Sequence, residues 1–460
     1  MRSAADSPFQ ISNVRLFIIF RLLFNARFYY PVFSILFLDF GLTLAQFAIL
    51  NAIWAATIVL CEVPSGALAD SFGRRNLLVL ASSLMVVEIA LWAFVPLGNL
   101  ALLFWVLVLN RILSGMAEAA ASGADEALAY DSLQRHGDSN DWGRVLERQI
   151  QFQSAGFVVA LTLGGVLYDP QVLQKALDLV GLPWHVTRTV TLRLPLYFTL
   201  ATALLTLLTT LRMREVADDP DPGGESCGRS INSAFRLVWL AGRWIARTPF
   251  VLALLLFGLL YDSVIRMILT MSSQYYRLIE IPESLFGVFG SLLALFGFVM
   301  PVVARRLSER HTPLFNLLLT AVVMLLGLGG ICFVWPWIGL LPALLLFSSM
   351  YLVGFFLSHY LNQATSSEQR ATVLSFKGLF LNLGYGGIGM LYALLLAILR
   401  GQRLLAEPGL AEAALKNGVF VDSLPWFVGY FGLLLLGLLV IFWRVLRNRP
   451  GATEQRSAGT

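Results

Sequence analysis

The chain has little charge for its length. Only 13% of its 460 residues are Asp, Glu, Lys or Arg, whereas soluble globular domains carry about 25%. Hydrophobic residues make up 57% of the sequence, and the mean hydropathy is +0.74. A chain with this composition has too few polar groups to cover a large soluble enzyme, so we expect an integral membrane protein.

Cysteine and histidine are also scarce. Cys61, Cys227 and Cys332 are too few and too widely spaced for a disulfide framework or a metal site. A polytopic membrane enzyme needs a cluster of His, Asp or Cys near a membrane interface, but the four histidines are scattered: His136, His185, His311 and His359. We therefore expect no metal, no cofactor and no enzymatic activity.

Long apolar runs fill most of the chain. A helical membrane span needs about 20 mostly apolar residues, whereas the strands of a membrane barrel need only about ten. The runs here have the length of helices. We expect twelve spans, at 14–38, 43–68, 77–97, 100–125, 149–168, 194–212, 249–272, 283–304, 313–333, 337–358, 371–398 and 424–446. The fold class is thus an all-α membrane protein.

The net charge of +5 is explained by orientation and not by a nucleic-acid partner. Of the 33 Lys and Arg residues, 22 lie at the termini, in the even-numbered connections or at the span ends beside them, and seven lie in the opposite loops. The positive-inside rule places the basic side, with both termini, in the cytoplasm. The N-terminus has no short apolar core followed by a small-residue cleavage site, so we expect the first span to be a retained helix.

The chain divides into two six-span halves, 1–212 and 248–450, followed by a tail at 451–460. Between the halves, residues 213–247 form a polar insert. Its first part is rich in Pro, Gly and acids, as flexible linkers are. Its second part favours an amphipathic helix at the membrane surface, with Phe235, Val238, Trp239, Gly242 and Ile245 on one face and Arg236, Arg243 and Arg247 on another. A plain solvated connector is the alternative.

Residues 223–230 in the insert have the spacing of a phosphate-binding P-loop, with Arg229 in place of the lysine. A P-loop also needs a preceding strand and a following helix, and neither is evident. We therefore expect no ATP binding. Any transport would use an ion or solute gradient.

Ionisable residues inside the spans are expensive in lipid and need a partner or a wet cavity. Span 4 carries Arg111, Glu118 and Asp125 at a spacing that puts them on one helix face. Glu118 is our candidate for a reversible proton site, and a static pair with Arg111 or with span 1 is the alternative. The other candidate charges are Arg21 and Arg27 in span 1, Glu62 in span 2, and Asp262 and Arg266 in span 7.

The partners of these other charges can be partly anticipated. Asp262 and Arg266 stand four residues apart and can neutralise each other on their own helix. Glu62 could reach Arg21 or Arg27, whereas Glu88 in span 3 has no evident local partner.

Traces of an internal repeat connect the halves, as expected when two halves pack around a shared site. Tyr29 and Tyr30, near the outer part of span 1, have counterparts in Tyr275 and Tyr276 after span 7. The segments 43–48 and 282–287 open spans 2 and 8 alike. We expect Tyr29 and Tyr30 to be aromatic residues of a central cavity.

The connection between spans 2 and 3 reads GALADSFGRR, residues 66–75. It resembles the signature loop of the major facilitator superfamily of secondary transporters, which it matches at Leu68 and at five further positions: Gly66, Asp70, Gly73, Arg74 and Arg75. The resemblance implies twelve spans in two pseudo-symmetric halves, and a cytoplasmic gate in which the arginines meet Asp125, Glu126 or Asp131. It also implies that spans 1, 4, 7 and 10 line the central cavity.

Two further patterns bear on transport. The segment from Arg111 to Gly115, with Glu118, resembles the family's span-4 pattern, in which the arginine is linked to proton transfer. The segment from Gly156 to Gly165 keeps the spacing of the span-5 motif of the family's antiporters, with Ala160 and Leu161 in place of Gly and Pro.

We therefore expect a monomeric transporter in a bacterial inner membrane that exports a small organic compound in exchange for protons. The substrate and the lipid bilayer are its only expected partners. Proton-linked uptake is the first alternative, and a membrane enzyme or a sensor with a transporter fold are the others.

Overall fold

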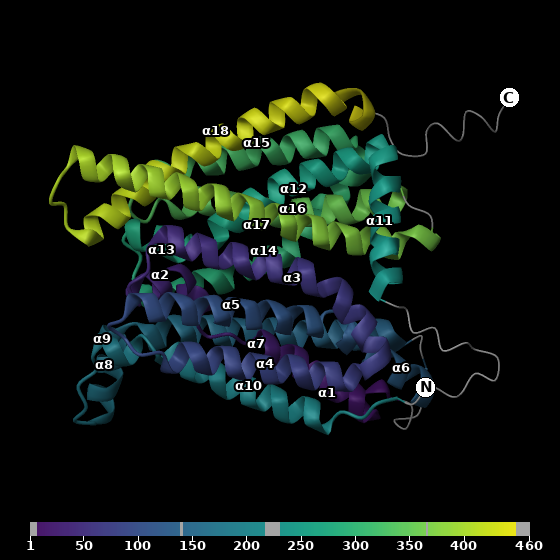
Figure 1. Ribbon diagram of the computed structural model, residues 1–460, viewed down its shortest axis with the longest axis horizontal. Helices are drawn as coiled ribbons and strands as arrows, with labels where there is room; N and C mark the ends of the chain where they lie inside the picture. The colour runs from purple at the N-terminus through teal and green to yellow at the C-terminus, as the bar shows by residue number, and fades with distance from the viewer. Residues whose placement is uncertain (1–6, 139–140, 217–230, 365–366, 448–460) are drawn as a thin grey trace. The chain divides into compact units, whose positions relative to one another are not determined.

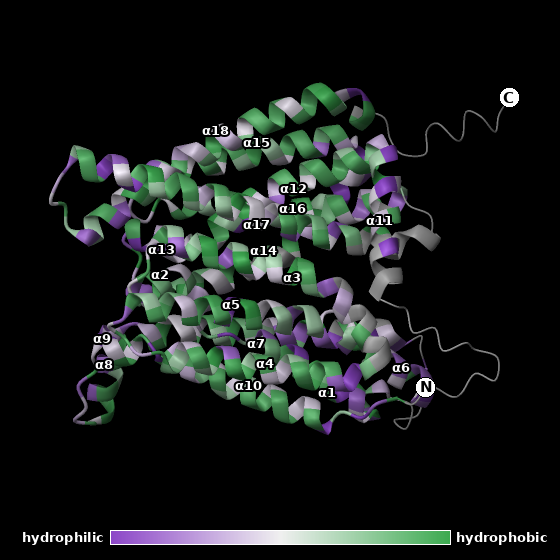
Figure 2. Cartoon of the chain, viewed as in Figure 1, coloured by the Kyte–Doolittle hydropathy of each residue, from purple (hydrophilic) through white to green (hydrophobic). Residues whose placement is uncertain are grey.

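A computed structural model of the chain describes residues 7–138, 141–216, 231–364 and 367–447. Nearly all of these residues are helical, and none of them forms a strand. Apolar residues dominate the helices, as Figure 2 shows. The predicted all-α class is confirmed. The tail at 451–460 and the P-loop-like segment at 223–230 lie outside the described residues.

Contacts divide the chain into two compact units. Unit 1 comprises Met1–Gly41, Ile53–Phe235 and Glu283–Ser291, and unit 2 comprises Leu42–Ala52, Arg236–Pro282 and Leu292–Thr460. The helices labelled in Figure 1 up to the central insert are α1 (Ser12–Asn25), α2 (Phe33–Asp39), α3 (Leu44–Phe72), α4 (Arg74–Phe94), α5 (Leu100–Ala121), α6 (Ala124–His136), α7 (Trp142–Tyr168), α8 (Pro170–Val180), α9 (Arg188–Thr191) and α10 (Leu194–Arg212). The later ones are α11 (Ile231–Arg247), α12 (Pro249–Thr270), α13 (Ser272–Leu278), α14 (Glu283–Arg310), α15 (Pro313–Ile331), α16 (Leu340–Ala364), α17 (Ser367–Ala406) and α18 (Glu412–Arg447).

Eleven helical stretches in the described part of the chain are long and apolar enough to cross a membrane. They correspond to every predicted span except the eighth. That span falls on α14, in which Glu283–Leu293 is an apolar stretch below the length of a full span. The predicted count of twelve is consistent with this arrangement.

The two halves repeat one packing scheme. In unit 1, α4 packs against α5 and α10, and α1 packs against α7 and α10. In unit 2, α15 packs against α16 and α18, and α12 packs against α17 and α18. Numbered as spans within each half, the third contacts the fourth and sixth, and the first contacts the fifth and sixth. The pseudo-symmetric halves expected from sequence are therefore present.

The openings of spans 2 and 8, which the sequence makes alike, also correspond structurally. Leu42–Ala52, at the start of α3, belongs to unit 2, while Glu283–Ser291, at the start of α14, belongs to unit 1. In each half, the start of the second span is thus assigned to the unit that holds the rest of the other half.

Glycines end two helices at places that differ from the sequence-based expectation. The signature loop is mostly helical, because α3 continues to Phe72 and only Gly73, with a φ of 91°, separates it from α4. In span 4 the helix stops at Ala121, and Gly123, with a φ of 78°, precedes α6. Such φ values suit glycine and interrupt a helix. The predicted continuous stripe from Arg111 to Asp125 is therefore wrong, since Asp125 lies on a separate helix.

The insert contains the predicted helix, α11, which runs across the direction of α12 and α17 (Figure 1). Of the residues predicted on its apolar face, Ile245 is buried, whereas Trp239 is 74% exposed; Arg236 and Arg243 are exposed as well. The inner face is anchored where Gly242 meets Phe376 of α17.

Candidate functional site

The first span is interrupted where its charged and aromatic residues lie. The predicted span 14–38 is present, but it is not one continuous helix: α1 ends at Asn25, and helix resumes only at Tyr30, with Pro31 near its start. Proline cannot continue the helical hydrogen-bond ladder. Threonines of α10 satisfy the freed backbone: Thr199 accepts from the Phe28 amide at 3.0 Å, and Thr202 donates to the Ala26 carbonyl at 3.2 Å.

A glycine of α7 lets that helix approach the interruption. A Cβ on Gly164 would lie 1.8 Å from the Phe28 carbonyl oxygen, which no side chain could tolerate. The glycine spacing noted in span 5 therefore has a direct packing function here. Broken membrane helices of this kind are typical of transporter binding sites.

Arg27, inside the interruption, binds a buried carboxylate. Its guanidinium lies 3.1 Å from Glu88 of α4, and both residues are almost completely buried. Asn110 of α5 donates to the backbone and the carboxylate of Glu88, and the Tyr29 hydroxyl accepts from Arg27 at 3.1 Å. Sequence reasoning left Glu88 without a partner, and the structure shows that its partner is 61 residues away.

Arg111 joins the same network through Asn110. Its Nε donates to the Asn110 side-chain oxygen at 2.9 Å, and its guanidinium lies 5.4 to 5.6 Å from three ring centres. These rings belong to Phe33, Phe37 and Trp92. Such cation–π contacts can stabilise a desolvated arginine by about 2 kcal/mol. Its Nη2 is buried without a hydrogen-bond partner among the described residues.

Glu118 faces Arg27 and not Arg111. The distance from its carboxylate to Arg27 Nη2 is 3.6 Å, and its side chain is 42% exposed. Of the two static pairs offered as alternatives, the pair with Arg111 is wrong and the pair with span 1 is present. Arg27 therefore lies between a fully buried carboxylate and one that solvent can reach.

Further charges gather where the second half of α1 meets the start of α6. Arg21 pairs with Asp125 and Glu126, and not with Glu62 as the sequence allowed. The Glu62 Oε2 atom is buried without a hydrogen-bond partner among the described residues. Tyr29 is also buried, while Tyr30 is partly exposed.

The signature loop is held by contacts from both of its sides. Arg74 pairs with Asp131 of α6, one of the three acids anticipated for it. The Glu215 carboxylate accepts from the amides of Arg74 and Arg75 at 3.2 and 2.9 Å, and thereby caps the start of α4. The surroundings of Gly66 and the side chain of Asp70 are outside what the structure describes.

The predicted pair in span 7 is present in unit 2. Arg266 pairs with Asp262 one turn away, donates to Asn382 at 2.8 Å and lies over the ring of Tyr385. Within unit 2 the Arg266 pair therefore extends onto α17, which the sequence pattern did not indicate.

Unit 1 contains a second cluster of charged side chains, which was not predicted from the sequence. Arg188 of α9 forms a two-pronged contact with Glu283, at 2.7 and 3.2 Å, and also pairs with Asp39. The Tyr168 hydroxyl donates to Asp39 at 2.7 Å, and its ring lies 4.1 Å from the Arg188 guanidinium. The cluster joins the ends of α2, α7 and α9 to the start of α14.

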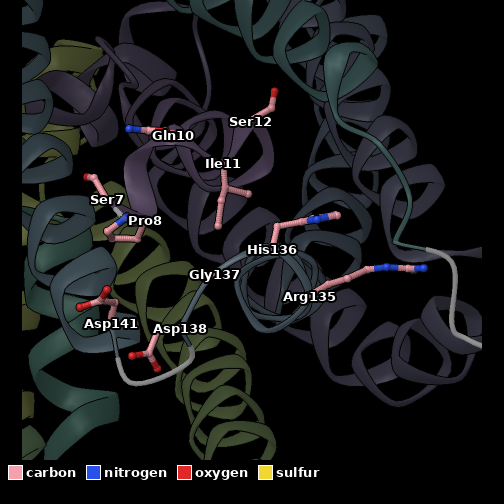
Figure 3. A pocket seen from close by; sticks show the side chains of 10 residues that line it. All are labelled: Ser7, Pro8, Gln10, Ile11, Ser12, Arg135, His136, Gly137, Asp138 and Asp141. Carbon is pink, nitrogen blue, oxygen red and sulfur yellow. The ribbon is translucent and has the colours of Figure 1, made fainter. Parts of the chain in front are cut away.

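A polar hollow of about 850 Å³ lies where α1, α6 and α7 begin or end. Its charged side chains do not converge: Asp138 and Asp141 lie on one side, while Arg135 and His136 extend in another direction (Figure 3). The Arg27 network, in which opposite charges do converge, is the better candidate site.

Sequence reasoning missed Asn110 and the partnership of Glu88. Two signals were available: Glu88 is a lone acid in an apolar helix, and Asn110 is the neighbour of Arg111. Neither signal names a partner, because the residues come together only when α1, α4 and α5 pack.

Comparison with known proteins agrees with this fold. The family model described as Major Facilitator Superfamily matches residues 16–386. Similar solved structures include the nucleoside transporter NupG (TM-score 0.68, 13% identity, covering 94% of this chain and 98% of that one) and a D-xylose-proton symporter (0.65, 13%, 96% and 99%). A bacterial homologue of the human lysosomal transporter Spinster is also similar (0.66, 16%, 97% and 98%). With the broken first span, the repeated halves and this match, the chain belongs to the major facilitator superfamily.

Proposed function

We propose that the protein is a proton-coupled secondary transporter of a small organic molecule and that Glu118 carries the proton. One observation supports this most directly: Arg27 lies between Glu88, which is fully buried, and Glu118, which is 42% exposed. Only the exposed carboxylate can exchange a proton with water without opening the protein. Glu88 then serves as the permanent counter-ion of Arg27.

Charge balance suggests what protonation does. Arg27 and Arg111 carry two positive charges, and Glu88 and Glu118 carry two negative ones, so the network is neutral while Glu118 is ionised. A proton on Glu118 leaves one positive charge in excess, and an uncompensated buried charge is costly. An anionic or zwitterionic substrate group could then take the place of Glu118 beside Arg27. With Tyr30 nearby, this favours an amphiphilic compound over a sugar or an inorganic ion.

Two observations bear on the direction of transport, and they favour opposite directions. The span-5 glycines, of which Gly164 packs on the broken first span, keep the spacing of an antiporter motif and favour export against protons. A proton symporter among the structural neighbours favours the alternative, in which proton and substrate move together. The charge balance above is compatible with such co-transport.

Purified protein in liposomes with an imposed pH gradient tests the proposal. A panel of zwitterionic, anionic, cationic and sugar compounds is offered, and transport is measured with and without a protonophore. We expect gradient-driven movement of at least one amphiphilic compound, abolished by the protonophore. The sign of the gradient that drives accumulation gives the direction. Transport of a sugar alone, or equal transport without a gradient, would contradict the proposal.

A further inference from the structure

A shallow apolar groove of about 430 Å³ runs along the surface of unit 1 between α1 and α7. Its floor and walls are apolar, from Ile18, Ile19, Leu22 and Phe152, and its only charged lining residues are Arg15 and Arg148. We propose that this groove binds one anionic phospholipid, with an acyl chain in the groove and the phosphate between the two arginines.

The residues on each helix occupy a single face. On α1, Arg15, Ile19 and Leu22 stand at positions i, i+4 and i+7, so the arginine is followed by apolar side chains along one stripe. On α7, Arg148 and Phe152 stand one turn apart and repeat that order. Each helix thus offers a cation first and apolar surface after it.

The two helices run in the same direction. Phe17 of α1 stacks on Trp142 at the start of α7, with ring centres 5.9 Å apart. Further along both helices, Leu22 lies against Gly156. Because the contacts follow the chain order in both helices, Arg15 and Arg148 lie at the same end of the groove. That end is also where both helices begin, at the level at which membrane helices meet headgroups.

Charge selects the headgroup. Both arginines are exposed, and neither has a carboxylate partner among the described residues; Arg148 contacts only Gln151, at 3.2 Å. Two such cations at the mouth of an apolar groove match a phosphate without a neighbouring ammonium, as in phosphatidylglycerol. Arginine also forms two-pronged contacts with phosphate. A zwitterionic lipid would bring its own positive charge to the same place.

The test is a titration of purified protein in detergent with a tail-labelled phosphatidylglycerol, followed by fluorescence anisotropy. The variant R15Q/R148Q removes the cations, and R306Q/R310Q, which neutralises two exposed arginines of α14, is the matched control. We expect about tenfold weaker binding or more in R15Q/R148Q, and unchanged binding in the control. The conservative variant R15K/R148K should retain most of the affinity, which separates loss of charge from loss of fold.

Two further arms test the tail and the occupant. Ile19→Trp fills the groove and should weaken phosphatidylglycerol binding while the melting temperature stays unchanged. Inorganic phosphate alone should not compete, and labelled phosphatidylcholine should bind no better to the wild type than to R15Q/R148Q. Equal phosphatidylglycerol binding by R15Q/R148Q and the control would overturn the proposal. So would a dimer, seen by light scattering, that Ile19→Trp dissociates, since a second copy would then occupy the groove.

Discussion

Arg27 is the residue on which the candidate site depends. It has left the helix, it is buried, and it has two carboxylate neighbours on different helices. The Glu88 carboxylate is additionally held by Asn110, whereas the Glu118 carboxylate has solvent on one side. This difference in burial underlies the proposal that Glu88 is the permanent counter-ion of Arg27 and Glu118 the proton carrier.

Glu118→Gln should abolish the dependence of transport on the pH gradient and leave the protein stable. Arg27 keeps Glu88 as its partner in this variant, so we expect a destabilisation below about 1 kcal/mol, as for other half-exposed pairs. Transport in liposomes with and without a gradient, and the melting temperature of the same preparation, measure both effects. A stable variant that still transports at the full proton-driven rate would remove Glu118 from the mechanism.

Glu88→Gln, in contrast to Glu118→Gln, should mainly lower the stability of the protein. The buried Arg27 network would lose Glu88, its fully buried counter-charge, and removing one partner of a buried pair destabilises by about 3–5 kcal/mol. We expect a clear fall in melting temperature, measured in detergent. Glu126→Gln is the control, because Glu126 is the exposed partner of Arg21. Wild-type stability in Glu88→Gln would show that the Arg27 pair is not needed to hold the fold.

At the scale of elements, the broken first span is possible only because its neighbours complete it. Threonines of α10 bind the unpaired backbone groups, and α7 comes close through a glycine. Without such partners an open backbone inside a membrane would be strongly unfavourable.

Gly164→Ala should therefore push α7 away from the interruption. The added Cβ would meet the Phe28 carbonyl oxygen at 1.8 Å, and overpacking of this kind destabilises by about 1–3 kcal/mol or more. Thermal melting followed by size-exclusion chromatography measures the effect. Gly354→Ala, in α16, has open space around its Cβ and should remain unchanged. Equal melting temperatures for the two variants would refute this packing role.

Arg188 links the start of α14 to α2 and α9. Arg188→Gln removes the two-pronged contact with Glu283 and the pair with Asp39, so we expect this end of α14 to loosen from α9. A cysteine placed at Ser284 should then react faster with a maleimide. Lys175→Gln removes one exposed positive charge from the same connection and should not change the rate. Unchanged reactivity in Arg188→Gln would show that other contacts hold α14 here.

At the scale of the whole molecule, the two halves share a packing scheme but differ in their charges. The first half carries two arginines and two carboxylates in one network, while the second carries a local pair, Asp262 and Arg266. The two halves therefore share a packing scheme but not a charge pattern.

The membrane orientation predicted from the basic residues is open to a direct test. In a background without Cys61, Cys227 and Cys332, single cysteines at Leu179 and Leu405, both strongly exposed, should react with an impermeant maleimide added to intact cells. Cys227 restored alone in the central insert should react only after the membrane is broken. Efficient labelling of Cys227 from outside would reverse the predicted orientation.

The membrane class, the span positions and the two-half organisation could be predicted because they depend on local composition. An apolar run of span length can be recognised from the sequence alone, without knowing which helices it packs against. The Asp262–Arg266 pair could be predicted for the same reason, since residues four apart on a helix always meet. Resemblance in the signature loop then identified the family, which the family model confirms.

The candidate site was decided only by the tertiary structure. Glu88 and Arg27 are 61 residues apart, and Glu118 faces Arg27 and not Arg111 of its own helix. Which charges pair depends on how α1, α4 and α5 rotate and pack. It also depends on the break in the first span, whose position the proline alone does not predict. Sequence periodicity places a charge on a helix face, but the neighbouring helix determines which charge it meets.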